Sequence, residues 1–185
     1  MLKKDDCQKL NNEFVFFQNI LMDILIRRAI FKKFEDEMKK THLTEHNDMM
    51  ALVWYGYTIS QLSDCRKFFA RDDDAHSFQF VVCHIKNEVL KKEHKTLFIF
   101  WKEEDLETVL NKYLLHANMR FRDIKTEVHV RVLDLFIDKL EKYIESIKDD
   151  LLKNYSGISV VGYGNFLLER EREVDVFFKE VRKNQ

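Results

Sequence analysis

Hydrophobic residues recur along this chain at spacings of three, four and seven, a pattern typical of amphipathic helices. It predicts three long helices, over about 4–40, 44–70 and 120–153. Arg28 interrupts the first apolar face, and we expect it either to snorkel to the edge of the core or to bind a partner or a phosphate. The three apolar faces consist of Leu10, Phe14, Phe17, Leu21, Ile24 and Phe31; of Leu52, Tyr55, Ile59, Leu62, Cys65 and Phe69; and of Leu133, Phe136, Leu140, Tyr143, Ile147 and Leu151.

Shorter helical patterns connect the long ones. One helix is expected from about 77 to 92 and another from about 103 to 116, whereas Leu97–Trp101 fits a strand or a buried helix equally well. The stretch 154–165 holds three of the four glycines and predicts a flexible connection or a small β-turn. A last helix is expected over 166–182, where alternating charges are typical of a solvated face.

Composition favours the same fold class. The chain of 185 residues contains no proline and 4 glycines, against roughly nine and thirteen at average usage. An all-β sandwich or barrel needs many tight turns, so this composition argues against one. We therefore predict an all-α protein: a bundle of about five or six helices, several long and antiparallel, forming a single domain over residues 1–185.

Charge and cysteine content limit the partners and the cellular compartment that we expect for the protein. The formal net charge is −1, so no global basic field indicates nucleic acid, although 31 basic residues leave room for a local patch. The three cysteines show no C-x-x-C spacing and are expected to be free thiols in a reducing compartment. The start of the chain is charged, and the longest charge-free runs are too short to span a bilayer. We expect a cytoplasmic protein without a membrane partner.

The sharpest polar interruption in the first half of the chain runs from Arg71 to Ser77. It places a guanidinium at the end of one helix and the imidazole of His76 beside the first turn of the next, which either Asp74 or Ser77 caps. The free N–H groups of a helix N-terminus attract anions, and arginine matches the geometry of a phosphate. Histidine can act as a general acid or base near neutral pH. This junction is therefore suited to cleaving RNA through its own 2′-hydroxyl, with no metal or other cofactor.

A resemblance to a known family rests on the same residues. The string Arg71-Asp-Asp-Asp-Ala-His76 matches the R-x4-6-H signature of the HEPN superfamily, including the narrower form in which a polar residue follows the arginine. The flanking segments Cys65–Phe69 and His76–Phe78 resemble the abortive-infection U-type branch of HEPN proteins. The similarity extends over about 52–85, under a fifth of the chain.

The resemblance implies a compact helical bundle that forms a homodimer and cleaves RNA as a metal-independent endoribonuclease. Such proteins act in toxin–antitoxin, abortive-infection or CRISPR-linked defence, so an antitoxin or a defence-system protein is an expected partner. By this resemblance Arg71 stabilises charge on the scissile phosphate and His76 moves the proton. Asp72 orients these two residues, and Ser77 begins the following helix.

Two basic residues just before the motif, Arg66 and Lys67, are predicted to contact the RNA backbone. The three consecutive aspartates Asp72–Asp74 depart from the expected pattern, because they would repel a phosphate unless they are paired. Many HEPN-like proteins have lost catalysis and serve as scaffolds. A catalytically inactive helical interaction protein is therefore the alternative interpretation.

Other sequence patterns leave a third interpretation open, a metal-dependent helical-bundle enzyme. His42-Leu-Thr-Glu-His46 matches the H-x-x-E-H pattern of one zinc peptidase class. With Thr44 as a cap, however, His42 lies outside the helix and the two rings do not converge. A second Arg–His match, from Arg122 to His129, lies in an unbroken helical pattern, and phosphate-binding glycine loops and a hydrolase elbow are absent. Separated histidines that could still bind a metal in a bundle are His46, His84 and His116.

Overall fold

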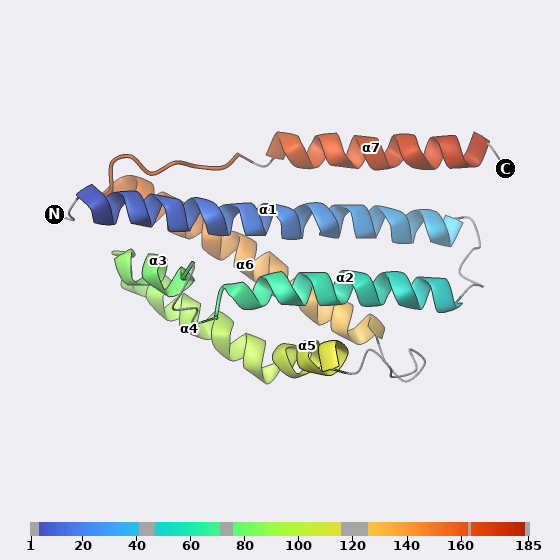
Figure 1. Cartoon of the computed structure of the whole chain (residues 1–185), viewed down its shortest axis with the longest axis horizontal. Coiled ribbons are helices and arrows are strands. Elements are labelled where there is room, and N and C mark those ends of the chain that lie inside the picture. The colour runs from blue at the N-terminus through green and yellow to red at the C-terminus, as the bar shows by residue number, and fades with distance from the viewer. Residues whose placement is uncertain (1–3, 41–46, 71–75, 116–125, 163, 184–185) are drawn as a thin grey trace.

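The computed structural model describes residues 4–40, 47–70, 76–115, 126–162 and 164–183. Within these residues the protein consists of seven helices and no strand, so the predicted all-α class is confirmed. The helices are α1 (Lys4–Lys40), α2 (Asn47–Lys67), α3 (Phe78–His84), α4 (Glu88–Glu103), α5 (Leu106–Leu115), α6 (Thr126–Asn154) and α7 (Gly164–Lys183), as shown in Figure 1.

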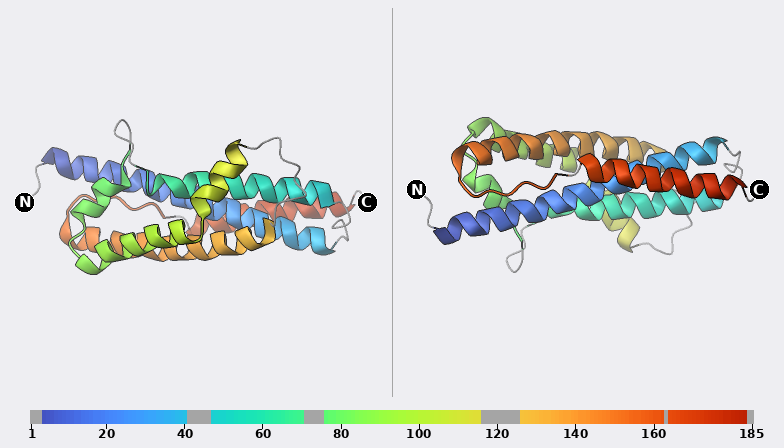
Figure 2. Two further views of the ribbon diagram at one scale, coloured as in Figure 1. Left: turned by 90° about the horizontal axis from the view of Figure 1, so that it is seen from below. Right: turned by 90° about the horizontal axis from the view of Figure 1, so that it is seen from above.

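The long helix α1 lies among four other helices of the bundle. It packs against α2, α3, α6 and α7, and α2 and α7 lie on opposite sides of it (Figure 1). The helix α6 crosses the bundle obliquely and packs against both α2 and α4, while α5 packs against α2 and α4. The views in Figure 2 show the same elongated arrangement, with the start of α1 and the end of α7 at opposite ends of the molecule.

The segment expected to form one helix over 77–92 forms two, so that prediction is wrong. Ile85 is extended, with φ −60° and ψ 133°, and it ends α3. The Asn87 side chain then accepts a hydrogen bond from the Val89 N–H at 2.9 Å and caps the start of α4. α4 continues through Leu97–Trp101, which makes that segment a helix rather than a strand. This break raises the number of helices above the five or six expected.

The apolar face expected for α2 is partly wrong. Leu52 is 57% exposed, whereas the polar residues Thr58 and Gln61 are buried. Gln61 is buried because it has partners there: its Nε2 donates a hydrogen bond to the Ile24 carbonyl at 2.8 Å, and its Oε1 accepts one from the Arg27 Nε at 3.3 Å. The helix is therefore rotated away from the orientation that its hydrophobic residues alone predict.

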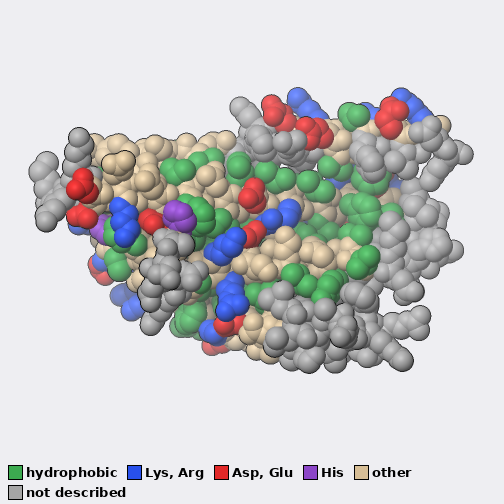
Figure 3. Space-filling view, viewed as in Figure 1, with side chains coloured by type: hydrophobic (Ala, Val, Ile, Leu, Met, Phe, Trp, Pro, Cys, Tyr) green, Lys and Arg blue, Asp and Glu red, His purple; other side chains and the backbone are tan. Residues whose placement is uncertain are grey.

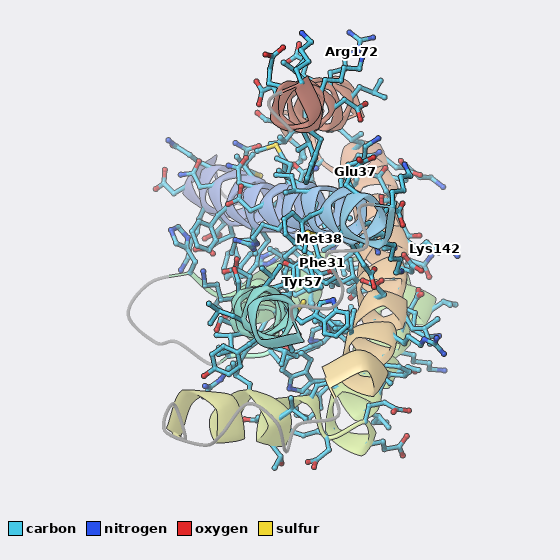
Figure 4. All side chains as sticks on the ribbon, turned by 90° about the vertical axis from the view of Figure 1, so that its right-hand side faces the viewer. Phe31, Glu37, Met38, Tyr57, Lys142 and Arg172 are labelled. Atoms are coloured by element: carbon cyan, nitrogen blue, oxygen red, sulfur yellow. The ribbon has the colours of Figure 1, made fainter. Side chains whose placement is uncertain are left out.

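Side-chain contacts fix α1 against its neighbours. The guanidinium of Arg28 lies 2.6 Å from the Asp138 carboxylate and 3.3 Å from that of Glu141, so Arg28 links α1 to α6 within the chain. Figure 4 shows Phe31 and Tyr57 between α1 and α2. Their rings stack with centroids 4.0 Å apart and planes 7° apart.

Aromatic rings meet at the point where five helices converge. The fully buried ring of Phe78, the first residue of α3, lies 4.9 Å from the ring of Phe17 and 5.0 Å from that of Phe68. It also lies 5.6 Å from the His94 ring of α4 and 6.3 Å from the Tyr143 ring of α6. This aromatic cluster holds the start of α3, and the residues just before it, in a fixed position on α1.

The connection between α6 and α7 lies along α1 and contains no strand among its described residues, 155–162. The Ser159 N–H donates to Asn11 Oδ1 at 2.6 Å, and the Tyr155 hydroxyl donates to the His84 carbonyl at 2.8 Å. Gly157 has φ +83°, a left-handed conformation that favours glycine.

Candidate functional site

His76 lies immediately before α3, and a residue of α1 holds it in place. Its Nδ1 lies 3.2 Å from Oε2 of Glu13, and its ring stacks on that of Phe16 with centroids 3.8 Å apart and planes 17° apart. Its side chain remains 40% exposed. The imidazole is thus fixed on one side and accessible to solvent on the other.

The same carboxylate oxygen of Glu13 accepts a second hydrogen bond, from the Ser77 N–H at 2.9 Å. Glu13 is only 5% exposed, and a buried carboxylate requires such donors. Ser77 occupies the N-cap position of α3, with φ −129° and ψ 112°, but its side chain makes no cap hydrogen bond. Of the two candidates, Asp74 and Ser77, it is Ser77 that occupies the N-cap position, but its backbone N–H is bound by Glu13 and its side chain does not cap the helix.

This contact determines which ring nitrogen of a neutral His76 is free. A carboxylate accepts hydrogen bonds, so Nδ1 must carry the proton that it donates to Glu13. The lone pair of Nε2 then remains available to accept a proton from a bound molecule. Residues 63 positions apart in the sequence thus form a carboxylate–imidazole pair of the kind used in general-base catalysis.

The predicted partners of His76 fall partly outside the described residues. Arg71 and Asp72 both belong to residues 71–75, which the structure does not describe. Arg66 and Lys67 are described, at the end of α2, and both are exposed. The structure therefore places one of the two predicted catalytic residues and both predicted RNA-contacting residues.

Arg66 and Lys67 line a groove beside the segment that carries the motif. The groove consists of two adjoining pockets, of about 570 and 230 Å³, which share Phe69, Ala70 and Phe98. The first pocket lies between the end of α2, the end of α4 and the start of α5, and the second lies between the end of α2 and the middle of α4. In Figure 3, Lys and Arg side chains gather on this face over the end of α2 and the adjoining part of α4.

The groove is lined by more positive than negative charge. Arg66, Lys67 and Lys102 line the first pocket together with Glu107, and Lys95 lines the second. Two of these cations are paired: Lys67 with Asp64 at 2.6 Å, and Lys102 with Glu107. Among the residues that the structure describes, no carboxylate lies within 4 Å of Arg66 or of Lys95. An anion that enters the groove therefore meets two cations that are not neutralised by an ion pair in that part of the chain.

His94 lines the second pocket and is held as a neutral imidazole. Its ring lies 5.7 Å from that of Phe69 and 6.0 Å from that of Tyr143. Burial lowers the pKa of His94 from its ordinary value near 6.5 to about 4. Its Nδ1 is buried without a hydrogen-bond partner among the described residues, and at neutral pH this histidine adds no positive charge to the groove.

The lowered pKa of His94 predicts a loss of stability in acid. The unfolded chain takes up a proton on His94 below about pH 6.5, whereas the folded protein does so only near pH 4. The stability linked to a neutral His94 is therefore fully present above pH 6.5 and declines as the pH falls toward 4, by about 3 kcal/mol in all. Urea unfolding at about pH 7 and about pH 4.5 should show a smaller pH dependence in His94→Phe than in the wild-type chain. Equal pH dependence in the two proteins would contradict the assignment.

The rival metal-binding patterns find no geometric support in the described part of the chain. His42 and His46 of the H-x-x-E-H match, His116, and Arg122 of the second Arg–His match all lie outside the described residues. His84 is described, and its Nδ1 lies 2.8 Å from the Phe80 carbonyl within α3. No group of three or more His, Cys, Asp or Glu side chains among the described residues could hold a metal ion.

Comparisons with protein-family models, with curated proteins and with solved structures give no match to this chain. The site is therefore interpreted from its own residues. Among the described residues, no helix combines the length and the hydrophobicity that crossing a membrane requires.

Sequence reasoning found His76 but missed the residues that hold it. Glu13 and Phe16 lie on α1, far from the motif in sequence, and a glutamate in a charged helix is ordinarily solvent-exposed. One signal was present: Glu13 lies three residues after Leu10 and four before Phe17, so it belongs to the predicted apolar face. A lone carboxylate on such a face indicates a buried partner.

Proposed function

We propose that this protein is a metal-independent endoribonuclease in which His76 and Arg71 cleave RNA through its own 2′-hydroxyl. On this proposal it acts as a homodimer in a defence or toxin–antitoxin system, as the HEPN resemblance implies. The groove lined by Arg66 and Lys67 would hold the RNA backbone on one side of the cleaved bond.

One observation carries the proposal: the hydrogen bond from His76 Nδ1 to the buried carboxylate of Glu13, at 3.2 Å. It supports a role for His76 as a general base, because it orients the ring and leaves Nε2 free at a 40% exposed position. The stacked ring of Phe16 adds a second restraint on the imidazole.

The proposed reaction uses these groups in a defined order. Nε2 of His76 takes the proton of the 2′-hydroxyl, and the 2′-oxygen forms a bond to phosphorus. The bond to the 5′-oxygen of the next nucleotide breaks, and that oxygen takes up a proton from water. The products are a 2′,3′-cyclic phosphate and a 5′-hydroxyl. Arg71, which lies outside the described residues, is assigned to the charge that develops on the phosphate.

A second candidate function, a catalytically inactive helical interaction protein, is favoured by a different contact. The Glu13 oxygen that holds His76 also accepts from the Ser77 N–H at 2.9 Å. A carboxylate in that position can serve purely to fasten α3 to α1. On this interpretation His76 is a second structural donor to Glu13, and the chain binds a partner without cleaving RNA.

Incubating the protein with single-stranded RNA and a chelator separates these functions. We expect cleavage, with products that carry 2′,3′-cyclic phosphate and 5′-hydroxyl ends by mass spectrometry. His76→Ala should abolish the cleavage and also controls for contaminating nuclease. His84→Ala is the matched control and should keep activity, because His84 is held by the Phe80 carbonyl within α3.

Each other outcome assigns the chain to a different function. RNA that stays intact with and without divalent metal would exclude the nuclease and leave the interaction protein. Cleavage that requires an added divalent ion would support the metal-dependent helical-bundle enzyme instead. Cleavage that persists in His76→Ala would show that another residue, or another protein, carries the activity.

A further inference from the structure

The groove between the end of α2 and α4 contains an exposed aromatic ring at the junction of its two pockets. Phe98 lines both the larger and the smaller pocket and is 41% exposed. Its ring lies 5.6 Å from that of Phe69, and the Lys102 Nζ lies 5.5 Å from its centroid. A large apolar side chain is therefore held in a basic groove and left accessible to a ligand.

The cations lie on both sides of this ring. Lys95, Phe98 and Lys102 are spaced at i, i+3 and i+7, so they share one face of α4. Arg66 lines the larger pocket from α2, and Lys95 lines the smaller one. Neither has a carboxylate within 4 Å among the residues that the structure describes. Along the groove the order is therefore a cation, an exposed ring and another cation.

We propose that this groove binds single-stranded RNA, with one base stacked on Phe98 and the flanking phosphates on Arg66 and Lys95. Proteins that bind single strands combine a basic groove with aromatic rings on which bases stack. In an A-form duplex the base faces are covered by their neighbours, so a duplex cannot use the ring. A peptide of acidic residues alone could contact the cations but has no ring to stack on Phe98. The inference rests on the proposed function for the choice of RNA.

Binding without cleavage tests this site directly. The probe is a short fluorescein-labelled single-stranded RNA with 2′-O-methyl groups throughout, which lacks the 2′-hydroxyl nucleophile. Fluorescence anisotropy should show that Phe98→Leu weakens binding about fivefold or more, because leucine keeps apolar area but cannot stack. Phe98→Trp should bind as well as the wild-type chain. Ile99→Ala is the matched control, since Ile99 is 51% exposed on the same helix and is not among the residues that line either pocket.

The salt dependence of RNA binding tests the proposed phosphate contacts separately from the stacking. Arg66→Ala and Lys95→Ala should each lower the slope of log affinity against log salt by about 0.7, the value for one lost contact to a single strand. Phe98→Leu should leave that slope unchanged. Circular dichroism and thermal unfolding of each variant establish that the fold is intact.

An abasic oligonucleotide of the same length decides whether a base is bound. The inference requires that the wild-type chain bind it more weakly than the normal strand and that Phe98→Leu make no further difference. Equal binding of both strands, or displacement of the RNA by polyglutamate at equal charge concentration, would overturn it. Phe98-dependent binding without cleavage of unmodified RNA would keep this inference and remove the nuclease. Cleavage of unmodified RNA, together with unchanged binding in Phe98→Leu, would support the nuclease and overturn this inference.

Discussion

Replacing Phe78 by alanine is expected to lower the free energy of unfolding by about 3–5 kcal/mol. The Phe78 side chain is completely buried, and its ring contacts Phe17, Phe68, His94 and Tyr143, which come from four different parts of the bundle. Alanine removes these contacts and leaves a cavity that five helices would have to close together. Such a site relaxes poorly, so the cost should fall in the upper part of the range. Urea unfolding followed by circular dichroism measures it.

Phe98→Ala provides the matched control for this stability prediction. It removes the same side-chain atoms from a neighbouring helix at a position that is 41% exposed. We expect a loss of about 1 kcal/mol or less, because little buried area disappears and water can fill the space. Similar losses in the two variants would show that Phe78 does not hold the junction as described. A large loss of stability in Phe78→Ala combined with preserved RNA binding would show that packing around Phe78 stabilises the fold but is not needed for binding in the groove.

The helices that the sequence predicts best are those with the strongest apolar period. The residues of the expected face of α6, from Leu133 to Leu151, are buried, and α1 extends over the expected 4–40. In helix α2, by contrast, the spacing of hydrophobic residues does not fully predict the buried face. It buries Thr58 and Gln61 and exposes Leu52, and the buried Gln61 side chain donates a hydrogen bond to the Ile24 carbonyl. A tertiary contact of this kind leaves no trace in a hydrophobic period.

The break between α3 and α4 was missed for a local reason. Residues 77–92 read as one helical pattern, yet Asn87 followed by Glu88 is a helix-start signal. Asparagine can sit within a helix at modest cost, so its role depends on whether its side chain accepts a backbone N–H. Here it accepts from Val89. The extended residue Ile85 remains buried in the core, so the chain turns without a glycine or a proline.

The sequence alone suggested the motif of the candidate site, but it did not predict which residues elsewhere in the chain contact that motif. The chemistry of histidine beside a helix start identified His76 from sequence. Its partner Glu13 lies 63 residues away, and only the packing of α3 on α1 brings the two together. Similarly, Lys95, Phe98 and Lys102 share a helical face by spacing alone, but the groove also requires Arg66 from α2. The geometry of this candidate site therefore depends on how α1, α2 and α4 pack together.

Glu13→Ala is expected to reduce RNA cleavage by about 10- to 100-fold, the size of effect seen when the orienting partner of a functional histidine is removed. The carboxylate contacts His76 rather than substrate, so Glu13 is a positioning residue. Its loss frees the ring to rotate and removes the acceptor that keeps the proton on Nδ1. The turnover rate should fall, while binding of 2′-O-methyl RNA, which depends on the groove, should stay unchanged. The turnover rate of Glu13→Gln should lie between those of Glu13→Ala and the wild-type chain, because an amide oxygen still accepts hydrogen bonds but carries no negative charge.

A purely structural role would change different quantities, and two measurements separate it. Nitrogen NMR of the His76 ring should show protonated Nδ1 in the wild-type chain and an altered tautomer balance in Glu13→Ala. Loss of the bond to the Ser77 N–H should also cost about 1–3 kcal/mol of stability, because that donor is left unsatisfied. Asp23→Asn is the charge control for Glu13→Gln: it removes an exposed carboxylate from the same helix and should alter neither the tautomer nor turnover. Reduced stability with unchanged tautomer and turnover would show that Glu13 only fastens α3 to α1. That result would favour the inactive interaction protein, because the contact with Glu13 would then not orient the His76 ring.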